Sequence, residues 1–251
     1  MVSIDAQRLR SRNINTATRL IEITQQLRRD CDALRFAEPV AHVYNPLAYA
    51  WAAQQEYLQR FGDATGRCVL LGMNPGPYGM VQTGVPFGEV AMVRDWMQIQ
   101  APIAQPAVVH PKRPIQGFDC RRSEVSGRRL WGWAAARYGS AEQFFARYFV
   151  VNYCPLVFME AGGRNRTPDK LAKSEREALY AICDQALCAT LECLQPSLAI
   201  GIGKFAEQKL LNLAADADYE IGCAPHPSPA SPVANRGWPP LMDAVADRYG
   251  L

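Results

Sequence analysis

The fold is decided by one stretch, Arg67-Cys-Val-Leu-Leu-Gly-Met-Asn-Pro-Gly-Pro-Tyr-Gly-Met-Val-Gln-Thr-Gly-Val-Pro-Phe-Gly88. Residues 67–72 form a short apolar run that ends in glycine, which is typical of a buried parallel strand. The loop that follows contains glycine at positions 72, 76, 79, 84 and 88, and proline at 75, 77 and 86. Glycine lets backbone approach a ligand closely and proline stiffens the chain. The stretch therefore predicts a strand that leads into a preformed pocket.

Similar apolar runs predict further strands at 148–152, 197–202 and 219–223. The spacing of apolar residues predicts helices at 13–35, 46–61, 89–100, 126–138, 174–194, 205–213 and 241–249, and loops at 101–117 and 154–169. Strands that alternate with helices indicate an α/β fold with a central parallel sheet flanked by helices. A chain of 251 residues suits a single domain over 1–251, with 1–44 as an N-terminal helical extension packed on it.

Composition limits the possible classes. The sequence has no apolar run of signal-peptide or membrane-span length, so we expect an intracellular protein, in the cytoplasm or nucleoid of a bacterium or the nucleus of a eukaryote. The net charge of +3, from 27 basic and 24 acidic residues, is too small to indicate a nucleic-acid binder. Two basic clusters, at 112–129 and 164–176, are consistent either with a solvated surface or with a site for phosphates.

The eight cysteines contain no C-x-x-C pair, and Cys183, Cys188 and Cys193 are spaced five apart, which scatters them around a helix. The three histidines lie far apart in the sequence, so a zinc site is not expected. We interpret the cysteines as reduced and mostly buried. An iron–sulfur cluster stays open as the alternative, and no cofactor or metal is otherwise predicted.

A second segment with the character of a site follows the last predicted strand: His226-Pro-Ser-Pro-Ala-Ser-Pro-Val-Ala-Asn-Arg-Gly-Trp238. Both segments come directly after strands, and ligands of open α/β sheets bind beyond the carboxyl ends of strands. The glycines of the first segment do not follow G-x-G-x-x-G, which argues against dinucleotide binding. Gly201-Ile-Gly-Lys204 lacks the upstream glycine of a P-loop.

These two segments, together with Asn152-Tyr-Cys-Pro-Leu156, resemble the motifs of the single-strand-selective monofunctional uracil-DNA glycosylases, within the uracil-DNA glycosylase superfamily. The resemblance covers most of the chain from about Asn45 onward. It implies a single α/β domain with a central parallel sheet, in agreement with the pattern of strands and helices. It also implies an enzyme that flips a base out of DNA and hydrolyses its bond to the sugar.

The resemblance assigns catalytic roles to Asn74, which would hold the attacking water, and to His226, which would donate a hydrogen bond to uracil O2 as negative charge develops there. A lone histidine is more often a structural residue, but its position after a strand favours the catalytic role. Substrate-binding roles fall on Met73, Gly76, Met80, Phe87 and Asn152.

Within this set, Phe87 would stack on the flipped base, although core packing is the alternative for an aromatic residue. Asn152 would read the uracil edge, and cytosine presents the opposite donors and acceptors. The Met73 backbone would contact the base. Gly76 would leave space near the pyrimidine C5, through which the family admits 5-hydroxymethyluracil.

For DNA, the resemblance indicates two segments, 162–176 and 234–237. The predicted DNA-binding residues are Arg164, Arg166, Lys170, Lys173, Arg176, Ser228, Ala230, Ala234, Asn235, Arg236 and Gly237. Basic side chains there would bind phosphates without reading sequence. Ala230 departs from the vertebrate pattern, which has arginine, and this puts wedging into a duplex in doubt.

We therefore expect a monomeric, metal-independent monofunctional glycosylase that releases uracil and 5-hydroxymethyluracil from single- and double-stranded DNA and initiates base excision repair. Two alternatives remain: a superfamily member acting mainly on deaminated purines such as xanthine and hypoxanthine, and a non-catalytic binder of damaged DNA.

Overall fold

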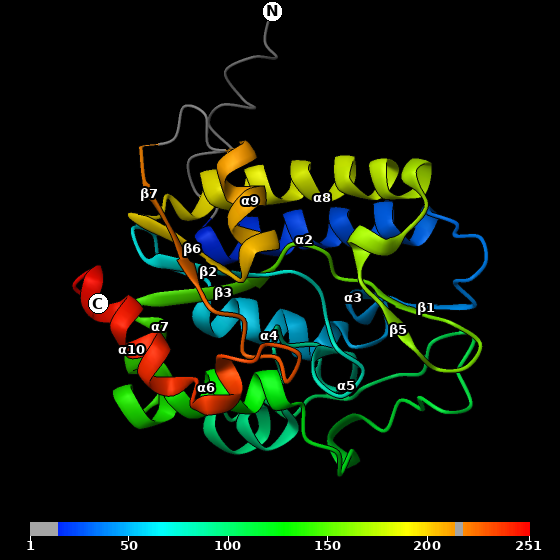
Figure 1. The fold of residues 1–251 in the computed structure, drawn as a ribbon, viewed down its shortest axis with the longest axis horizontal. Helices are drawn as coiled ribbons and strands as arrows, with labels where there is room; N and C mark the ends of the chain where they lie inside the picture. Colours follow the sequence, from blue (N-terminus) through cyan, green and yellow to red (C-terminus); the bar gives the residue numbers. More distant parts are fainter. Residues whose placement is uncertain (1–14, 214–217) are drawn as a thin grey trace, which may run out of the picture.

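A computed structural model describes residues 15–213 and 218–251 (Figure 1). Its centre is a four-stranded parallel sheet in the order β3-β2-β6-β7. The strands are β2 (Cys68–Gly72), β3 (Tyr148–Asn152), β6 (Leu198–Ile202) and β7 (Glu220–Ala224). Gly72 lies opposite Asn152, and Ile202 lies opposite Ala224, so the carboxyl ends of all four strands meet at one edge. The predicted α/β class with a central parallel sheet is confirmed.

Helices cover both faces of this sheet, which explains why every residue of β2 and β6 is buried. In Figure 1, α2 (Thr16–Ala33), α8 (Lys173–Leu194) and α9 (Lys204–Leu213) lie above the sheet. Below it lie α4 (Trp51–Phe61), α6 (Val125–Tyr138), α7 (Ala141–Phe145) and α10 (Pro239–Arg248). The helix expected over 46–61 is interrupted at Ala50, which separates α3 (Pro46–Tyr49) from α4.

A small antiparallel sheet in the order β1-β4-β5 corrects the predicted loop at 154–169. Its strands are β1 (His42–Tyr44), β4 (Val157–Met159) and β5 (Asn165–Arg166). β4 pairs with β5, which follows closely in sequence, and with β1, which is distant, so no local pattern in the sequence indicates the pairing with β1. The N-terminal segment thus contains a strand as well as α2, and residues 1–14 of the predicted extension lie outside the described residues. That the whole chain is one domain stays a prediction.

Several short turns of helix were not expected. α5 (Met80–Thr83) lies inside the glycine- and proline-rich loop, and η2 (Gly117–Asp119) begins at the last residue of the predicted loop 101–117. The helix expected over 89–100 is reduced to a short segment that includes the π-turn η1 (Met92–Trp96). The remaining turns are η3 (Pro168–Lys170) and η4 (Ala234–Arg236). Among the described residues, no helix is long and apolar enough to cross a membrane.

Candidate active site

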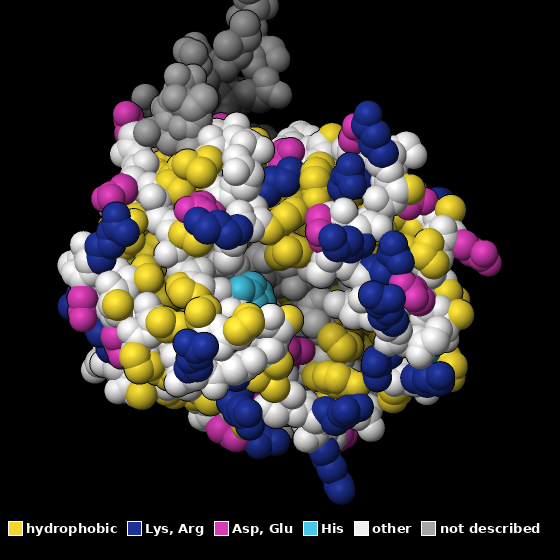
Figure 2. Space-filling view, viewed as in Figure 1, with side chains coloured by type: hydrophobic (Ala, Val, Ile, Leu, Met, Phe, Trp, Pro, Cys, Tyr) yellow, Lys and Arg dark blue, Asp and Glu magenta, His cyan; other side chains and the backbone are white. Residues whose placement is uncertain are grey.

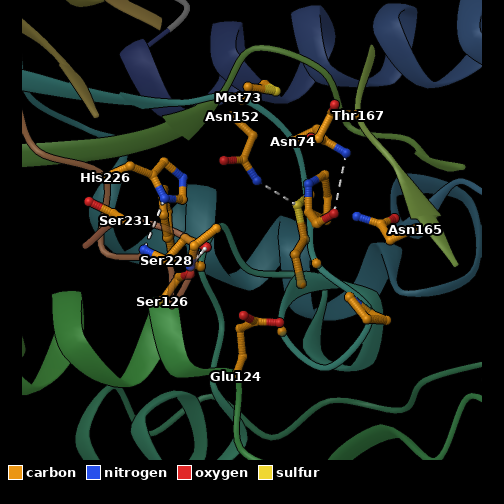
Figure 3. Close-up of a pocket in the computed structure, with 17 residues that line it drawn as sticks. Met73, Asn74, Glu124, Ser126, Asn152, Asn165, Thr167, His226, Ser228 and Ser231 are labelled. Carbon is orange, nitrogen blue, oxygen red and sulfur yellow. Dashed lines mark hydrogen bonds between the residues drawn. The ribbon is translucent and has the colours of Figure 1, made fainter. Parts of the chain in front are cut away.

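A cavity of about 460 Å³ opens at the carboxyl edge of the parallel sheet (Figure 3). The loop after β2, the end of β3 and the loop after β7 all contribute to its lining. Every residue predicted to bind or cleave substrate lines it, as do two of the predicted DNA-binding residues: Met73, Asn74, Gly76, Met80, Phe87, Asn152, His226, Ser228 and Ala230. Segments far apart in the sequence therefore meet as the resemblance implies, whereas their individual roles stay predictions.

Asn74 is held so that only its oxygen remains free to bind a ligand. Its Nδ2 donates to the carbonyl oxygens of Leu156, at 3.1 Å, and Pro75, at 3.3 Å. An amide nitrogen has two hydrogens, so both are engaged. The side chain therefore presents an acceptor, Oδ1, which suits a bound water.

His226 is prepared in the opposite sense, as a donor. Its Nδ1 accepts a hydrogen bond from the Ser228 N–H at 3.0 Å, which leaves the ring proton on Nε2. Burial lowers the pKa of His226 below its ordinary value of 6.5, which favours the neutral ring. Gly203, with φ of +90°, passes the ring so closely that an added Cβ would lie 3.1 Å from the His226 Cβ.

Gly72 makes room for two side chains of the cavity, since a Cβ there would collide with Asn152 and with the Phe87 ring. Asn152 donates from Nδ2 to the Met80 sulfur at 3.4 Å. Phe87 adopts a φ of +53°, which is uncommon for an aromatic residue, and its carbonyl oxygen accepts from the Trp131 indole at 3.1 Å. This anchoring holds a strained residue at the cavity wall.

The structure adds lining residues that the sequence did not single out: Glu124, Ser126, Asn165, Thr167 and Ser231. In Figure 3, Ser231 lies on the same side as His226, Asn165 and Thr167 lie on the other side, and Glu124 lies below. Burial raises the pKa of Glu124, and the backbone N–H groups of Ser126 and Tyr78 partly offset that effect. Ser231 belongs to the second motif, and Asn165 and Thr167 fall within the predicted DNA-binding segment 162–176, but no signal in the sequence indicated Glu124 or Ser126.

The Glu124 carboxylate borders the space beside Gly76. A Cβ added at Gly76 would lie 2.5 Å from Oε2 of Glu124. The room left by the missing side chain is therefore bounded by a carboxylate. A substitution at Gly76 must displace that carboxylate before it can fill any space near a bound base.

The predicted basic segment 164–176 borders the cavity, because Asn165 and Thr167 line it. Three of its five cations already have carboxylate partners: Arg166 with Glu160 at 2.6 Å, Lys170 with Asp169 at 3.2 Å, and Lys173 with Glu177 at 3.9 Å. Figure 2 shows Lys and Arg side chains along the right-hand and lower margins of the hollow in which a histidine is visible. Positive charge therefore borders the hollow on two sides.

In the turn after His226, Arg129 holds the backbone by donating to the Pro227 carbonyl oxygen at 2.8 Å and to Asn235 Oδ1 at 3.0 Å. Asn235 in turn donates to the Pro229 carbonyl oxygen at 2.8 Å. Ala234 is only 1% exposed, so its side chain supports the turn from inside. Arg236 and Gly237 follow at the end of η4.

All eight cysteines are free thiols, and five of them are buried, in line with the prediction that most lie inside the protein. Cys68 is an example: it lies in β2, and burial raises the pKa of its thiol. Within the described ranges, no group of three or more His, Cys, Asp or Glu side chains is arranged to hold a metal ion.

Comparison with known proteins agrees with this geometry. The sequence matches the Uracil DNA glycosylase superfamily over residues 59–242. Relatives described as single-strand selective monofunctional uracil-DNA glycosylases, from Mus musculus and Rattus norvegicus, are each 44% identical over 233 residues, which cover 92% of this chain and 84% of theirs. A solved structure described as wild-type Pedobacter heparinus SMUG2 has a TM-score of 0.68 at 18% identity, covers 94% of this chain and 97% of its own, and is alike in fold. The chain therefore belongs to the uracil-DNA glycosylase superfamily and, within it, to the single-strand selective monofunctional uracil-DNA glycosylases.

Proposed function

We propose that this protein is a monofunctional DNA glycosylase that hydrolyses the N-glycosidic bond of uracil and of 5-hydroxymethyluracil in DNA, and so initiates base excision repair. One observation carries the proposal: a single cavity brings together an acceptor, Asn74 Oδ1, and a neutral donor, His226 Nε2–H. The relatives with 44% identity, named as uracil-DNA glycosylases, support the choice of uracil.

The reaction divides the work between these two residues. The bond between the sugar C1′ and uracil N1 breaks, and its electron pair stays on the base and spreads to O2. His226 Nε2–H donates to that oxygen as it becomes anionic. Water held by Asn74 Oδ1 adds to the oxocarbenium-like sugar and loses one proton, which neutralises the uracil anion, so the products are an abasic sugar and free uracil. An amide is a weak base, so Asn74 orients the water and does not need to deprotonate it before the bond breaks.

Selection of the base rests on Asn152 and Phe87. The Asn152 amide offers both a donor and an acceptor. Uracil donates from N3–H and accepts at O4, whereas cytosine accepts at N3 and donates from its N4 amino group. The Phe87 ring stacks on the flipped base. Its centroid lies 6.4 Å from that of His226, so both aromatic groups border the same space. The Met73 carbonyl oxygen is bound to the Cys154 N–H, so contact with the base falls to other atoms of that residue.

The wider proposal concerns the partner. The enzyme acts as a monomer on uracil in single- and double-stranded DNA, in the compartment that holds the cell's DNA. Its contacts to the phosphate backbone of the DNA come from Arg164, Arg176 and Arg236. Activity mainly on deaminated purines is not favoured, because the most similar proteins reported above are named for uracil. A non-catalytic binder would have no need for the paired acceptor and donor.

The test is turnover on oligonucleotides that each carry one modified base, followed by alkaline cleavage. We expect alkali-labile sites at uracil, also in the presence of chelator. Before alkali treatment the strand should stay intact, because neither motif has a lysine that could form a Schiff base with the sugar. No release from any uracil-containing strand would refute the proposal. High-yield borohydride trapping would contradict the monofunctional mechanism.

A further inference from the structure

The first basic cluster, 112–129, contains a feature that the catalytic site does not use. The hydroxyl oxygen of Tyr78 accepts hydrogen bonds from two guanidinium groups, Arg113 Nη1 and Arg122 Nη1, each at 2.7 Å. Both groups also lie against the Tyr78 ring, at 5.6 Å and 4.5 Å from its centroid. We call these three residues the Tyr78 cluster.

Two like charges held at one oxygen repel each other unless an anion is near. Among the residues that the structure describes, neither Arg113 nor Arg122 has a carboxylate within salt-bridge distance. The segment 164–176 differs, because most of its cations are paired. The positive charge of the Tyr78 cluster is thus the less compensated of the two.

The cluster also has donors to spare. Arg122 uses only Nη1 in the described hydrogen bonds, and Arg113 uses Nε, to the Gly163 carbonyl oxygen at 3.2 Å, and Nη1. Arg113 Nη2 and the Nε and Nη2 of Arg122 remain. Because the Tyr78 oxygen accepts from both arginines, its own O–H is free to donate as well.

The position of the cluster relates it to the catalytic cavity. Tyr78 lies between Pro77 and Gly79, both of which line the cavity, and Arg122 precedes the lining residue Glu124. Arg113 reaches the loop that leads to the lining residue Asn165. The cluster therefore ties together three segments that form the wall of the cavity.

We propose that the Tyr78 cluster binds one backbone phosphate of the DNA strand whose flipped base enters the cavity. The inference rests on the proposed function. Guanidinium groups present planar pairs of N–H donors that match phosphate oxygens, and the phenol O–H adds a donor between them. A bound phosphate also offsets the repulsion between the two arginines. Because the contact is to the backbone, it supplies affinity and register and not base selection.

The test uses single-stranded oligonucleotides that contain non-cleavable 2′-fluoro-2′-deoxyuridine and one neutral methylphosphonate linkage, moved stepwise along the strand. Binding is measured by fluorescence anisotropy over a range of salt concentrations. For the wild type, we expect one linkage near the modified base at which neutralisation weakens binding. In Arg122→Gln that linkage becomes insensitive, and the slope of log K against log salt falls by about 0.7, the value for one phosphate contact on a single strand.

Arg121→Gln is the matched control, because Arg121 is exposed, lies next to Arg122 and has no described side-chain partner. It should keep the wild-type linkage pattern. Tyr78→Phe, which keeps the ring and removes the hydroxyl, should weaken the same linkage effect. If Arg122→Gln does not fold, Arg122→Lys, which keeps the charge and loses the planar fork, should reduce the linkage effect instead.

Equal linkage sensitivity in the wild type and in both Arg122 variants would overturn the phosphate site, as would an identical change in Arg121→Gln. A cluster that only braces the loops would lower the unfolding temperature in Tyr78→Phe and leave the linkage pattern unchanged, which also overturns it. The proposed function fails separately, if the wild type releases no uracil from a cleavable strand of the same sequence.

Discussion

Asn74 is fixed by two carbonyl oxygens, and that fixation leads to the first prediction. Asn74→Ala removes the acceptor for the attacking water, and we expect single-turnover uracil release to slow by about 10²–10³, the usual loss for one catalytic hydrogen-bonding group. The fold should persist, because the lost contacts cost only about 1 kcal/mol each. Near-normal release by a variant with a native circular dichroism spectrum would exclude the assigned role.

The neutral state of His226 predicts a dependence on pH. Protonation of Nδ1 would place a hydrogen against the Ser228 N–H and break the bond that orients the ring. Because burial lowers the pKa of His226, the rate should stay level above pH 6.5 and fall only at a lower pH. Single-turnover rates across the acid range measure this limb.

Glutamine provides the control, because its amide donates without titrating. His226→Gln should be slower than the wild type but should lose the acid limb that belongs to His226. Glu124, whose pKa burial raises, is a second titrating group of the cavity. The assignment of the acid limb to His226 would be contradicted if the fall in rate at low pH were unchanged both in His226→Gln and in the double variant His226→Gln/Glu124→Gln.

Gly76 and Glu124 support a third prediction. Gly76→Ala places a methyl group against the Glu124 carboxylate, 2.5 Å from Oε2, so the carboxylate must move. We expect slower release of both bases, with 5-hydroxymethyluracil affected at least as much as uracil. Adding Glu124→Asp shortens the side chain and should recover part of the rate.

The two substrates are compared as single-turnover rates on strands of one sequence. Recovery in the double variant would assign the loss to the displaced carboxylate. No recovery would assign it to filled space near C5. Unimpaired excision of both bases by Gly76→Ala would show that Gly76 does not border the bound base.

At the scale of elements, the turn after β7 is braced by Arg129 and carries Ala230 at the cavity. A flipped base leaves a gap in the duplex, and a short side chain fills little of it. We therefore predict that Ala230→Arg raises the rate on duplex uracil opposite adenine more than on single strands. Single-turnover release at fixed salt measures both.

Ala230→Gln is the matched control, since it adds length without charge and should reproduce part of the gain on duplex. An equal gain on both substrates would mean that arginine acts through its charge alone. No gain on either would mean that another residue of the turn already fills the gap.

At the scale of the whole molecule, the catalytic cavity and a buried arginine that stabilises the fold lie at opposite ends of β2. The buried Arg67, just before the strand, donates to the carbonyl oxygens of Phe61, Phe145 and Ala64. Arg67→Met leaves these acceptors without partners, and we expect the free energy of unfolding to fall by about 3 kcal/mol. The rate of uracil release should stay near that of the wild type, because the cavity lies at the other end of the strand.

Urea unfolding measures the change, and Arg147→Met is its control. Arg147 is exposed and has no described side-chain partner, so its loss should leave stability nearly unchanged. A large loss of activity in folded Arg67→Met would contradict the separation of the two ends.

The sequence by itself determined the central sheet and the place of the site. Strands buried on both faces are continuous apolar runs, so 67–72, 148–152, 197–202 and 219–223 were recognisable within a residue or so of their observed bounds. The motifs that follow β2 and β7 had to meet, because parallel strands bring their carboxyl ends to one edge. The sequence therefore predicted that the segments holding Asn74 and His226 meet, whereas the catalytic roles of the two residues came from the family resemblance.

Only the tertiary structure decided what closes around that edge. The strands β1, β4 and β5 are short, and β1 pairs with β4 across a long separation in the sequence, so the stability of this small sheet comes from partners and not from local pattern. Glu124 and Asn165 reach the cavity from segments with no periodicity of their own. The contact of Tyr78 with Arg113 and Arg122 was also visible only in the tertiary structure. It depends on how three loops fold together, and no one of the three loop sequences indicates it.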